Sequence, residues 1–130
     1  SLNLDIEYLK AKVEAGADYI VTQLFFDNSK YFAFVEKCRA AGITVPIIPG
    51  LKPLSTKRQL SILPQIFHVD IPDDLAIQAI KCKDNTQVRQ LGIEWCIQQS
   101  KELRDAGVPV LHYYSMGKSQ NIYEIASAIF

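Results

Sequence analysis

Hydrophobic positions along the chain follow two alternating patterns, one typical of helices and one typical of strands. Apolar residues at helical spacing among charges predict helices over residues 4–15, 29–41, 56–67, 72–82 and 86–106, and a last helix from residue 119. Short runs rich in β-branched and aromatic residues predict strands over 19–26, 45–48 and 110–114. The strand runs are apolar almost throughout, which is typical of parallel strands buried on both faces.

Capping residues mark the expected ends of these helices. Gly16, Gly42 and Gly107 each follow a helical pattern, where a left-handed backbone favours glycine. Candidate N-caps precede the patterns at 27–29, 55–56, 84–86 and Ser119, and Pro72 fits the first turn of the helix over 72–82. Helices and strands therefore alternate along the chain.

This alternation predicts an α/β protein with a parallel sheet and helices outside it. Two architectures remain open, the eight-stranded β/α barrel and the open doubly wound sheet. Both place functional groups at the carboxyl ends of the strands. Three strands complete neither architecture, so in a barrel this chain would be the last part. Its 130 residues suffice for a single domain.

Charge and cysteine content narrow the function classes. Fourteen basic residues balance fourteen acidic ones, which argues against a nucleic-acid or membrane-surface binder. No apolar run approaches the length of a membrane span, and no secretory leader is visible. The three cysteines, Cys38, Cys82 and Cys96, form no CxxC pair and predict reduced thiols in a cytoplasmic protein.

Polar residues at the strand ends are the candidates for chemistry. Gln23 stands inside an apolar strand, where its amide either pairs with backbone groups or contacts the edge of a heterocycle. Lys52 and Tyr114 follow the second and third strands. Asp5, Tyr8 and Lys12 share one helical stripe, which is either a solvated face or a ligand-facing edge.

Other motifs are weak. Gly117-Lys118-Ser119 lacks the first glycine of a P-loop, so it predicts a plain helix cap or a site for an anion. His68 and His112 have no cysteine or carboxylate at metal-ligand spacing, and we expect no metal site. We expect His112 to be a core residue of its strand, and Cys38 and Cys96 to act as small hydrophobic residues.

Several blocks together resemble the methylenetetrahydrofolate reductase family. They are Ala15 to Asp27, Ala41-Gly42-Ile43, Pro46 to Pro53, Ile71-Pro72, Gly92-Ile93, Gly107-Val108 and Leu111 to Met116. The blocks keep the family's order over nearly the whole chain. The resemblance implies the C-terminal part, about three strands with flanking helices, of a (β/α)8 TIM barrel that holds FAD. It also implies reduction of methylenetetrahydrofolate by NAD(P)H in one-carbon and methionine metabolism.

The resemblance also implies roles for individual residues. Asp5, Tyr8 and Lys12 match positions that hold FAD. Gln23 matches an amide that contacts the folate pterin and the nicotinamide in turn, and Gln59 and Lys118 match further substrate contacts. Leu63 stands where some members have a phenylalanine beside the substrate. The family's ring-opening acid lies in earlier strands, so no catalytic residue is expected here.

Two hypotheses follow for residues 1–130 as one partial barrel domain. The first is a flavin-dependent oxidoreductase of which this chain carries part of the site. The second is an inactive barrel piece that serves as a binding or assembly module. We expect the isolated chain to be inactive and the protein to be a homo-oligomer. Because an unclosed sheet leaves edges unpaired, either the chain associates with copies of itself or the missing strands are present in the protein and not part of this sequence. Ile20, Ile47 and Leu111 are expected to face the missing barrel wall.

Overall fold

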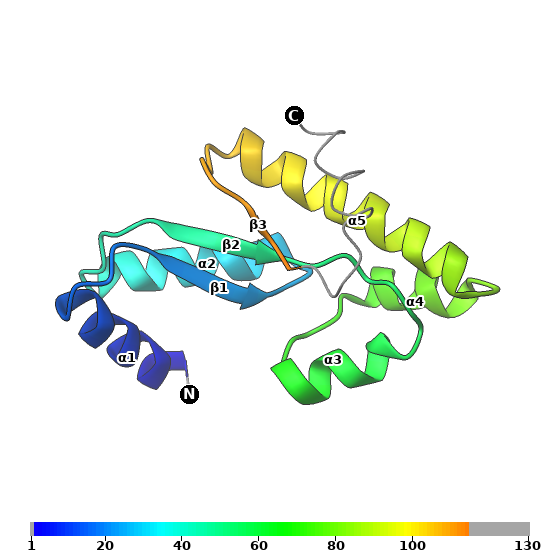
Figure 1. Cartoon of the computed structure of the whole chain (residues 1–130), viewed down its shortest axis with the longest axis horizontal. Coiled ribbons are helices and arrows are strands. Elements are labelled where there is room, and N and C mark those ends of the chain that lie inside the picture. Colours follow the sequence, from blue (N-terminus) through cyan, green and yellow to red (C-terminus); the bar gives the residue numbers. More distant parts are fainter. Residues whose placement is uncertain (1, 115–130) are drawn as a thin grey trace.

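The computed structural model describes residues 2–114, and their side chains from Ile6 onward. These residues form, in order, α1 (Leu2–Glu14), β1 (Ile20–Leu24), α2 (Asn28–Ala40), β2 (Ile47–Leu51), α3 (Gln59–Phe67), α4 (Asp73–Lys81), α5 (Asn85–Asp105) and β3 (His112–Tyr113) (Figure 1). The order agrees with the predicted alternation. The helix predicted from Ser119 lies outside the described residues.

The strands form one parallel sheet in the order β1-β2-β3. Ile20 pairs with Ile47 and Leu24 with Gly50, with an irregularity between Val21 and Leu24. Gly50 in turn pairs with His112. The sheet is therefore parallel as predicted, and the carboxyl ends of all three strands lie at the same edge.

Most predicted caps are confirmed. Asp27 accepts a hydrogen bond from the Ser29 amide at 2.9 Å, and Asp84 accepts one from the Gln87 amide at 3.0 Å. Gly16, Gly42 and Gly107 have positive φ after α1, α2 and α5. Pro72 takes the N-cap position of α4, one residue before its first turn. The chain thus enters and leaves these helices where its short-range chemistry predicts.

The start of α3 corrects the cap predicted at Ser55-Thr56. The helix begins after Arg58, and no side chain caps it. Gln59 instead accepts hydrogen bonds through its Oε1 from the amides of Ser55 at 2.7 Å and Thr56 at 3.3 Å. A helical amide side chain therefore satisfies the donors of the preceding loop, and the hydroxyls do not start the helix.

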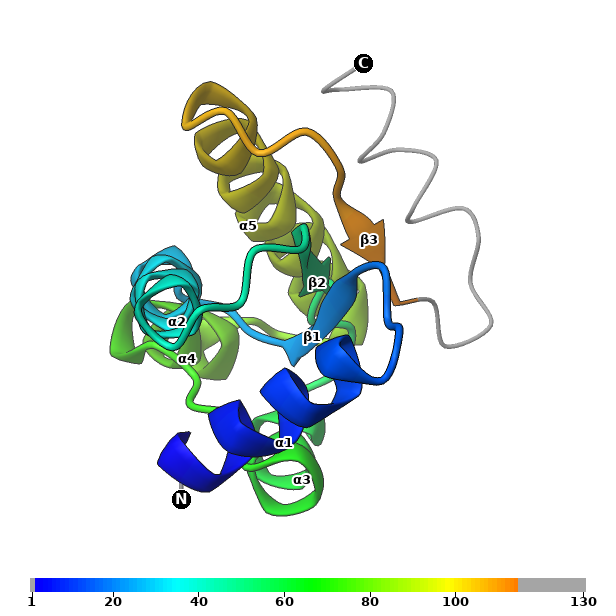
Figure 2. The ribbon, with the colours of Figure 1, turned by 90° about the vertical axis from the view of Figure 1, so that its left-hand side faces the viewer.

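One hydrophobic cluster lies between the sheet and the helices α2 and α5, which follow the same side of it (Figure 2). Ile20 and Ile47 belong to this cluster, which corrects the prediction that they face a missing wall. Their pairing in register puts both on the helix side of the pleat. Leu111 is half-buried and packs against the same cluster.

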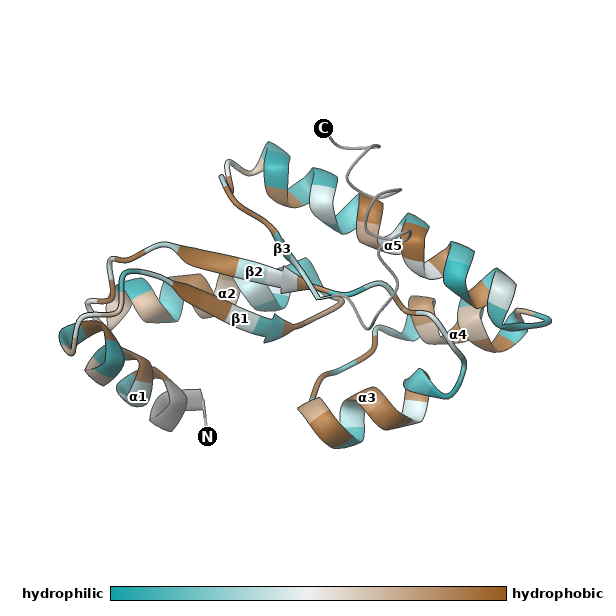
Figure 3. Cartoon of the chain, in the orientation of Figure 1, coloured by the Kyte–Doolittle hydropathy of each residue, from teal (hydrophilic) through white to brown (hydrophobic). Residues whose placement is uncertain are grey.

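A second cluster joins α3, α4 and the first turns of α5. Leu63, Leu75 and Val88 meet Leu54 and Phe26 there. The first residues of β1 and β2 are hydrophobic and β1 is hydrophilic near its end, whereas α5 alternates hydrophilic and hydrophobic positions along its length (Figure 3). The two clusters lie along one long helix, so α5 ties the sheet to α3 and α4.

Two predictions about single residues have opposite outcomes. Cys38 and Cys96 are buried in the first cluster, as predicted. His112 is exposed, so the prediction of a core histidine is wrong. Its ring packs edge-on against Tyr114, with centroids 4.7 Å apart, because β3 is short and lies at the edge of the described sheet. Within residues 2–114, no helix has the length and apolar character needed to cross a bilayer.

Candidate functional site

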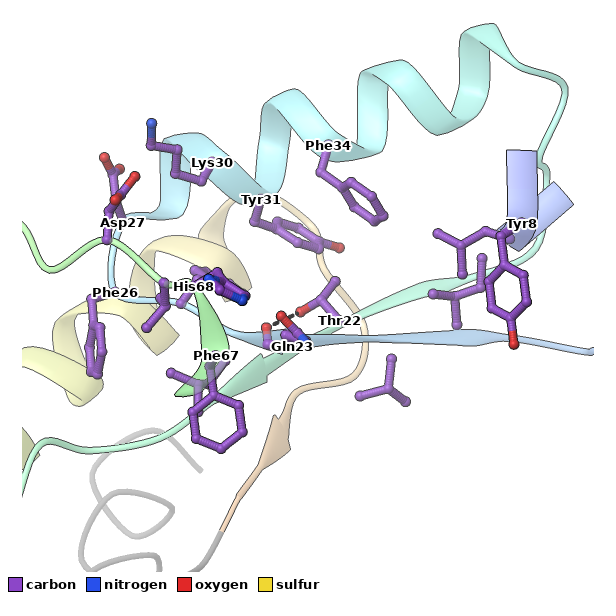
Figure 4. A pocket seen from close by; sticks show the side chains of 17 residues that line it. Tyr8, Thr22, Gln23, Phe26, Asp27, Lys30, Tyr31, Phe34, Phe67 and His68 are labelled. Atoms are coloured by element: carbon purple, nitrogen blue, oxygen red, sulfur yellow. Dashed lines mark hydrogen bonds between the residues drawn. The ribbon is translucent and has the colours of Figure 1, made fainter. Parts of the chain in front are cut away.

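A cleft of about 490 Å³ runs along β1 and the loop that follows it (Figure 4). Its walls come from α1, from β1 and the loop after it, from the first turns of α2 and from residues 67–70 at and after the end of α3. Its volume falls within the usual range for small-molecule sites. The cleft therefore lies where the sequence places a functional rim, at the carboxyl end of a parallel strand.

Gln23 lines this cleft and is exposed, while Leu24 next to it is buried. An exposed side chain near the end of β1 has its amide available to a ligand. The alternative of an amide satisfied inside the core is therefore not what the structure shows. Gln offers one acceptor and two donors, which suits the edge of a heterocycle.

Three strands contribute to the rim beside Gln23. The Tyr114 hydroxyl donates to the Thr22 carbonyl at 2.8 Å, and the Gly50 amide donates to the Thr22 hydroxyl at 2.9 Å. A Cβ at Gly50 would lie 2.5 Å from both the Thr22 carbonyl oxygen and the Tyr114 ring, so only glycine lets the tyrosine cross β2. These contacts fix the strand segment that carries Gln23.

The stripe on α1 is described in part. Tyr8 lines the cleft and is 61% exposed. The Lys12 Nζ lies 4.9 Å from the centre of the Tyr8 ring, a distance typical of a cation–π contact. The backbone of Asp5 is in α1, but its side chain lies outside the described set. Tyr8 and Lys12 are thus adjacent, and Tyr8 reaches the cleft.

The other predicted substrate residues with described side chains are not in the lining of this cleft. Gln59 is half-buried and uses its Oε1 to cap the 55–56 loop. Leu63 is 3% exposed and packs in the second cluster. Lys118 lies outside the described residues. The structure therefore brings Gln23 and Tyr8 to one cleft, with Lys12 beside Tyr8, and leaves Gln59 in a structural contact.

Sequence reasoning missed several residues of the cleft. His68 lies opposite β1, and its side chain points into the cleft (Figure 4). Its backbone is left-handed, with φ of 52°, where α3 ends. Lys30, Phe67 and Asp70 also line the cleft. Helical periodicity cannot predict how the chain turns at the end of α3, so the positions of Phe67, His68 and Asp70 in the cleft had no sequence signal. Lys30 lies in the first turn of α2, and a single exposed lysine there had no signal either.

Burial shifts the pKa values of two ionisable groups that pack against the sheet, Tyr31 and Lys52. Tyr31 lines the cleft and donates its hydroxyl to the Ile47 carbonyl, and burial raises its pKa. Lys52 follows β2 and is 3% exposed, and burial lowers its pKa. Lys52 is outside the cleft lining. Within the described part of the chain, no three metal-ligating side chains gather in one place.

Comparison with known proteins decides the family. The family model described as methylenetetrahydrofolate reductase matches residues 1–129. The chain belongs to the methylenetetrahydrofolate reductase family. This confirms the resemblance drawn from the sequence blocks.

Two relatives illustrate the match. A probable methylenetetrahydrofolate reductase (NADPH) of Caenorhabditis elegans is 36% identical over 99% of this chain and 20% of its own length. The 5,10-methylenetetrahydrofolate reductase of Escherichia coli strain K12 is 34% identical over 99% of this chain and 44% of its own length. The chain therefore spans less than half of these reductases.

A solved structure is similar in fold. It is an uncharacterised Clostridium thermocellum protein, described as binding two copies of 5-methyl-5,6,7,8-tetrahydrofolic acid. The match has a TM-score of 0.58 at 20% identity, and it covers 95% of this chain and 46% of that one. At this identity the likeness concerns the fold alone.

Proposed function

We propose that this chain is the C-terminal part of the (β/α)8 barrel of a flavin-dependent methylenetetrahydrofolate reductase that uses NAD(P)H. The observation that carries the proposal is the exposed Gln23 amide in a cleft at the carboxyl end of β1, in a chain of this family. Residues 1–130 would form one partial catalytic domain without a second domain.

The open edge of the sheet supports the barrel. In the described residues, β1 pairs with β2 on one side and with no strand on the other. The strands are parallel, and the chain spans 44% of the Escherichia coli relative. Preceding barrel strands would pair with the free edge of β1 and close the cleft from that side.

The cleft suits a planar, polar heterocycle. Gln23 can donate to and accept from the edge of a pterin or a nicotinamide. The rings of Tyr31 and Phe67 supply apolar surface in the same cleft. In this proposal Gln23 binds and orients methylenetetrahydrofolate and the nicotinamide in turn, and this chain contributes no acid to ring opening.

The α1 stripe fits part of a flavin nucleotide. Lys12 is exposed, and its ammonium group could pair with a phosphate, while the Tyr8 ring offers an aromatic surface beside it. Bound FAD would supply the hydride chemistry. Asp5, Tyr8 and Lys12 would hold it, and Gln59 and Lys118 remain proposed substrate contacts. A homo-oligomer and a cytoplasmic location are part of the same proposal.

The experiment uses the full-length reductase. We expect it to purify with flavin absorbance and to oxidise NAD(P)H in the presence of methylenetetrahydrofolate. Lys12→Ala should lower the flavin content, because a phosphate would lose its cation, whereas Lys10→Ala on the same helix should retain wild-type flavin. A colourless, inactive protein would overturn the proposal, and equal flavin loss in both variants would remove Lys12 from the flavin site.

A further inference from the structure

A second cleft, of about 310 Å³, lies on the other side of the Phe26–Asp27 segment, between the start of α2 and the middle of α5. Its lining contains the carboxylates Asp27 and Glu102, the indole of Trp95 and three side-chain amides. No basic residue occurs among these lining residues. The chain as a whole has no net charge, whereas the lining of this cleft is acidic and rich in hydrogen-bond acceptors.

A buried amide network fixes the orientation of the groups at the back of this cleft. The Asn28 Nδ2 donates to the backbone carbonyl of Gln99 at 3.1 Å and to the Glu102 Oε2 at 3.0 Å. The Gln99 Nε2 donates to the Phe25 carbonyl and to the Asn28 Oδ1, each at 3.2 Å. Reversing the Gln99 amide would place its oxygen against two acceptors, so its orientation is determined.

This network leaves one acceptor without a donor. Gln99 is 4% exposed, and its Oε1 is the one buried side-chain polar atom without a hydrogen-bond partner in the described residues. Buried polar atoms are normally paired, so an orphaned oxygen on a residue that lines the cleft indicates a missing donor. The carboxylates of Asp27 and Glu102 favour a donor that carries a positive charge.

The indole of Trp95 limits the class of ligand further. The Trp95 Nε1 donates to the Phe26 carbonyl at 2.9 Å, which holds the indole in place along the cleft. A guanidinium group is planar, stacks on aromatic faces and carries five donors for carboxylate and amide oxygens. A metal ion fits less well, since the described residues contain no group of three metal-ligating side chains.

We propose that this second cleft binds a guanidinium group, held by Glu102 and Asp27, stacked against Trp95 and donating to Gln99. The site shares Phe26 and Asp27 with the lining of the cleft that carries Gln23, but it contains no other residue of that cleft. The proposal does not depend on the proposed reductase activity. The guanidinium can belong to a free alkylguanidine or to an arginine side chain of another polypeptide. Both sources present the same guanidinium group to the cleft.

The test uses the full-length reductase and measures binding by isothermal titration calorimetry. The protein is titrated with N-methylguanidinium at concentrations below those that unfold proteins, and in parallel with N-methylurea, which is neutral and has nearly the same shape. We expect a saturable change with N-methylguanidinium and none with N-methylurea. This comparison needs no variant, so it holds even if the substitutions impair folding.

Two matched variants locate the site. Glu102→Gln keeps an acceptor for Asn28 and removes the charge, and it should weaken binding about fivefold, the size expected for one exposed ion pair. Glu94→Gln is the control, because Glu94 is also an exposed glutamate of α5 and accepts from Gln90, four residues earlier, as Glu102 does from Gln98. It should leave the dissociation constant unchanged.

A further titration separates the two sources of the guanidinium. Acetyl-arginine-amide represents an arginine side chain in a polypeptide. Tighter binding of this compound than of N-methylguanidinium would identify a polypeptide ligand, and equal or weaker binding would identify a free alkylguanidine. The proposal is overturned if N-methylguanidinium gives no saturation, if N-methylurea acts equally, or if Glu102→Gln and Glu94→Gln bind alike.

Discussion

Lys52 carries its charge into a buried position at the end of β2. It is 3% exposed, and no carboxylate among the described side chains, Ile6 to Tyr114, pairs with it. Burial therefore lowers the pKa of Lys52 below its usual 10.5. The unfolded chain binds more protons than the folded chain between the folded pKa and 10.5, so stability rises with pH in that window.

We predict that Lys52→Met raises the melting temperature, because it removes a buried charge, and that this gain shrinks as the pH rises toward 10.5 through pH 6, 8 and 10. Thermal unfolding at the three pH values measures both effects. Lys37→Met, at an exposed position of α2, is the control and should give no such pH-dependent gain. A gain for Lys52→Met that is equal at all three pH values would show that its charge does not destabilise the fold.

At the level of single residues, the sequence predicted which polar side chains lie at strand ends better than it predicted whether a side chain is buried or exposed. The position of Gln23 at the end of a strand was correctly placed on the rim. The burial of Lys52 and the exposure of His112 were not predicted, because both depend on which elements cover a strand end. His68 had no signal, since its place in the cleft depends on the turn after α3.

Gly92 decides how closely α5 approaches the loop after β2. A Cβ at this position would lie 1.8 Å from the Leu54 carbonyl oxygen and 2.7 Å from two further backbone atoms of the same residue. Backbone atoms cannot move aside as a flexible side chain can. The absence of a side chain at Gly92 therefore lets the helix pack directly against Leu54 in the second cluster.

We predict that Gly92→Ala destabilises the protein by about 3 kcal/mol, the upper end of the usual cost of overpacking, although alanine favours helices. Chemical denaturation measures the change. Arg89→Ala, at an exposed position of the same helix, should change the stability by less than about 0.5 kcal/mol. A Gly92→Ala protein as stable as wild type would contradict the close packing.

At the level of elements, the sequence predicted the order, the type and most caps, because helical spacing and cap chemistry are local. The cap of α3 was misplaced because Gln59, a residue inside the helix, supplies the acceptor for the loop before it. The prediction of strands buried on both faces holds for β2 more than for the short β3, which ends the described sheet.

At the level of the whole molecule, the sequence blocks predicted the family, and the comparisons confirm it. The barrel remains a proposal, because closure depends on strands that a chain spanning 44% of the Escherichia coli relative does not include. The state of the isolated chain is a prediction of the same kind. Its second cleft, between α2 and α5, had no signal in the sequence because its residues come from distant segments.

The central claim is that Gln23 contacts the substrate. The most direct test is a stopped-flow measurement of the folate half-reaction in the full-length reductase, the rate at which methylenetetrahydrofolate reoxidises the reduced flavin. Gln23→Ala removes the hydrogen bonds to the heterocycle, worth roughly 1–3 kcal/mol, so we predict a rate about 5- to 150-fold lower at limiting substrate. Gln65→Ala, at an exposed position of α3, should match wild type. A Gln23→Ala enzyme that is reoxidised at the wild-type rate would contradict the account.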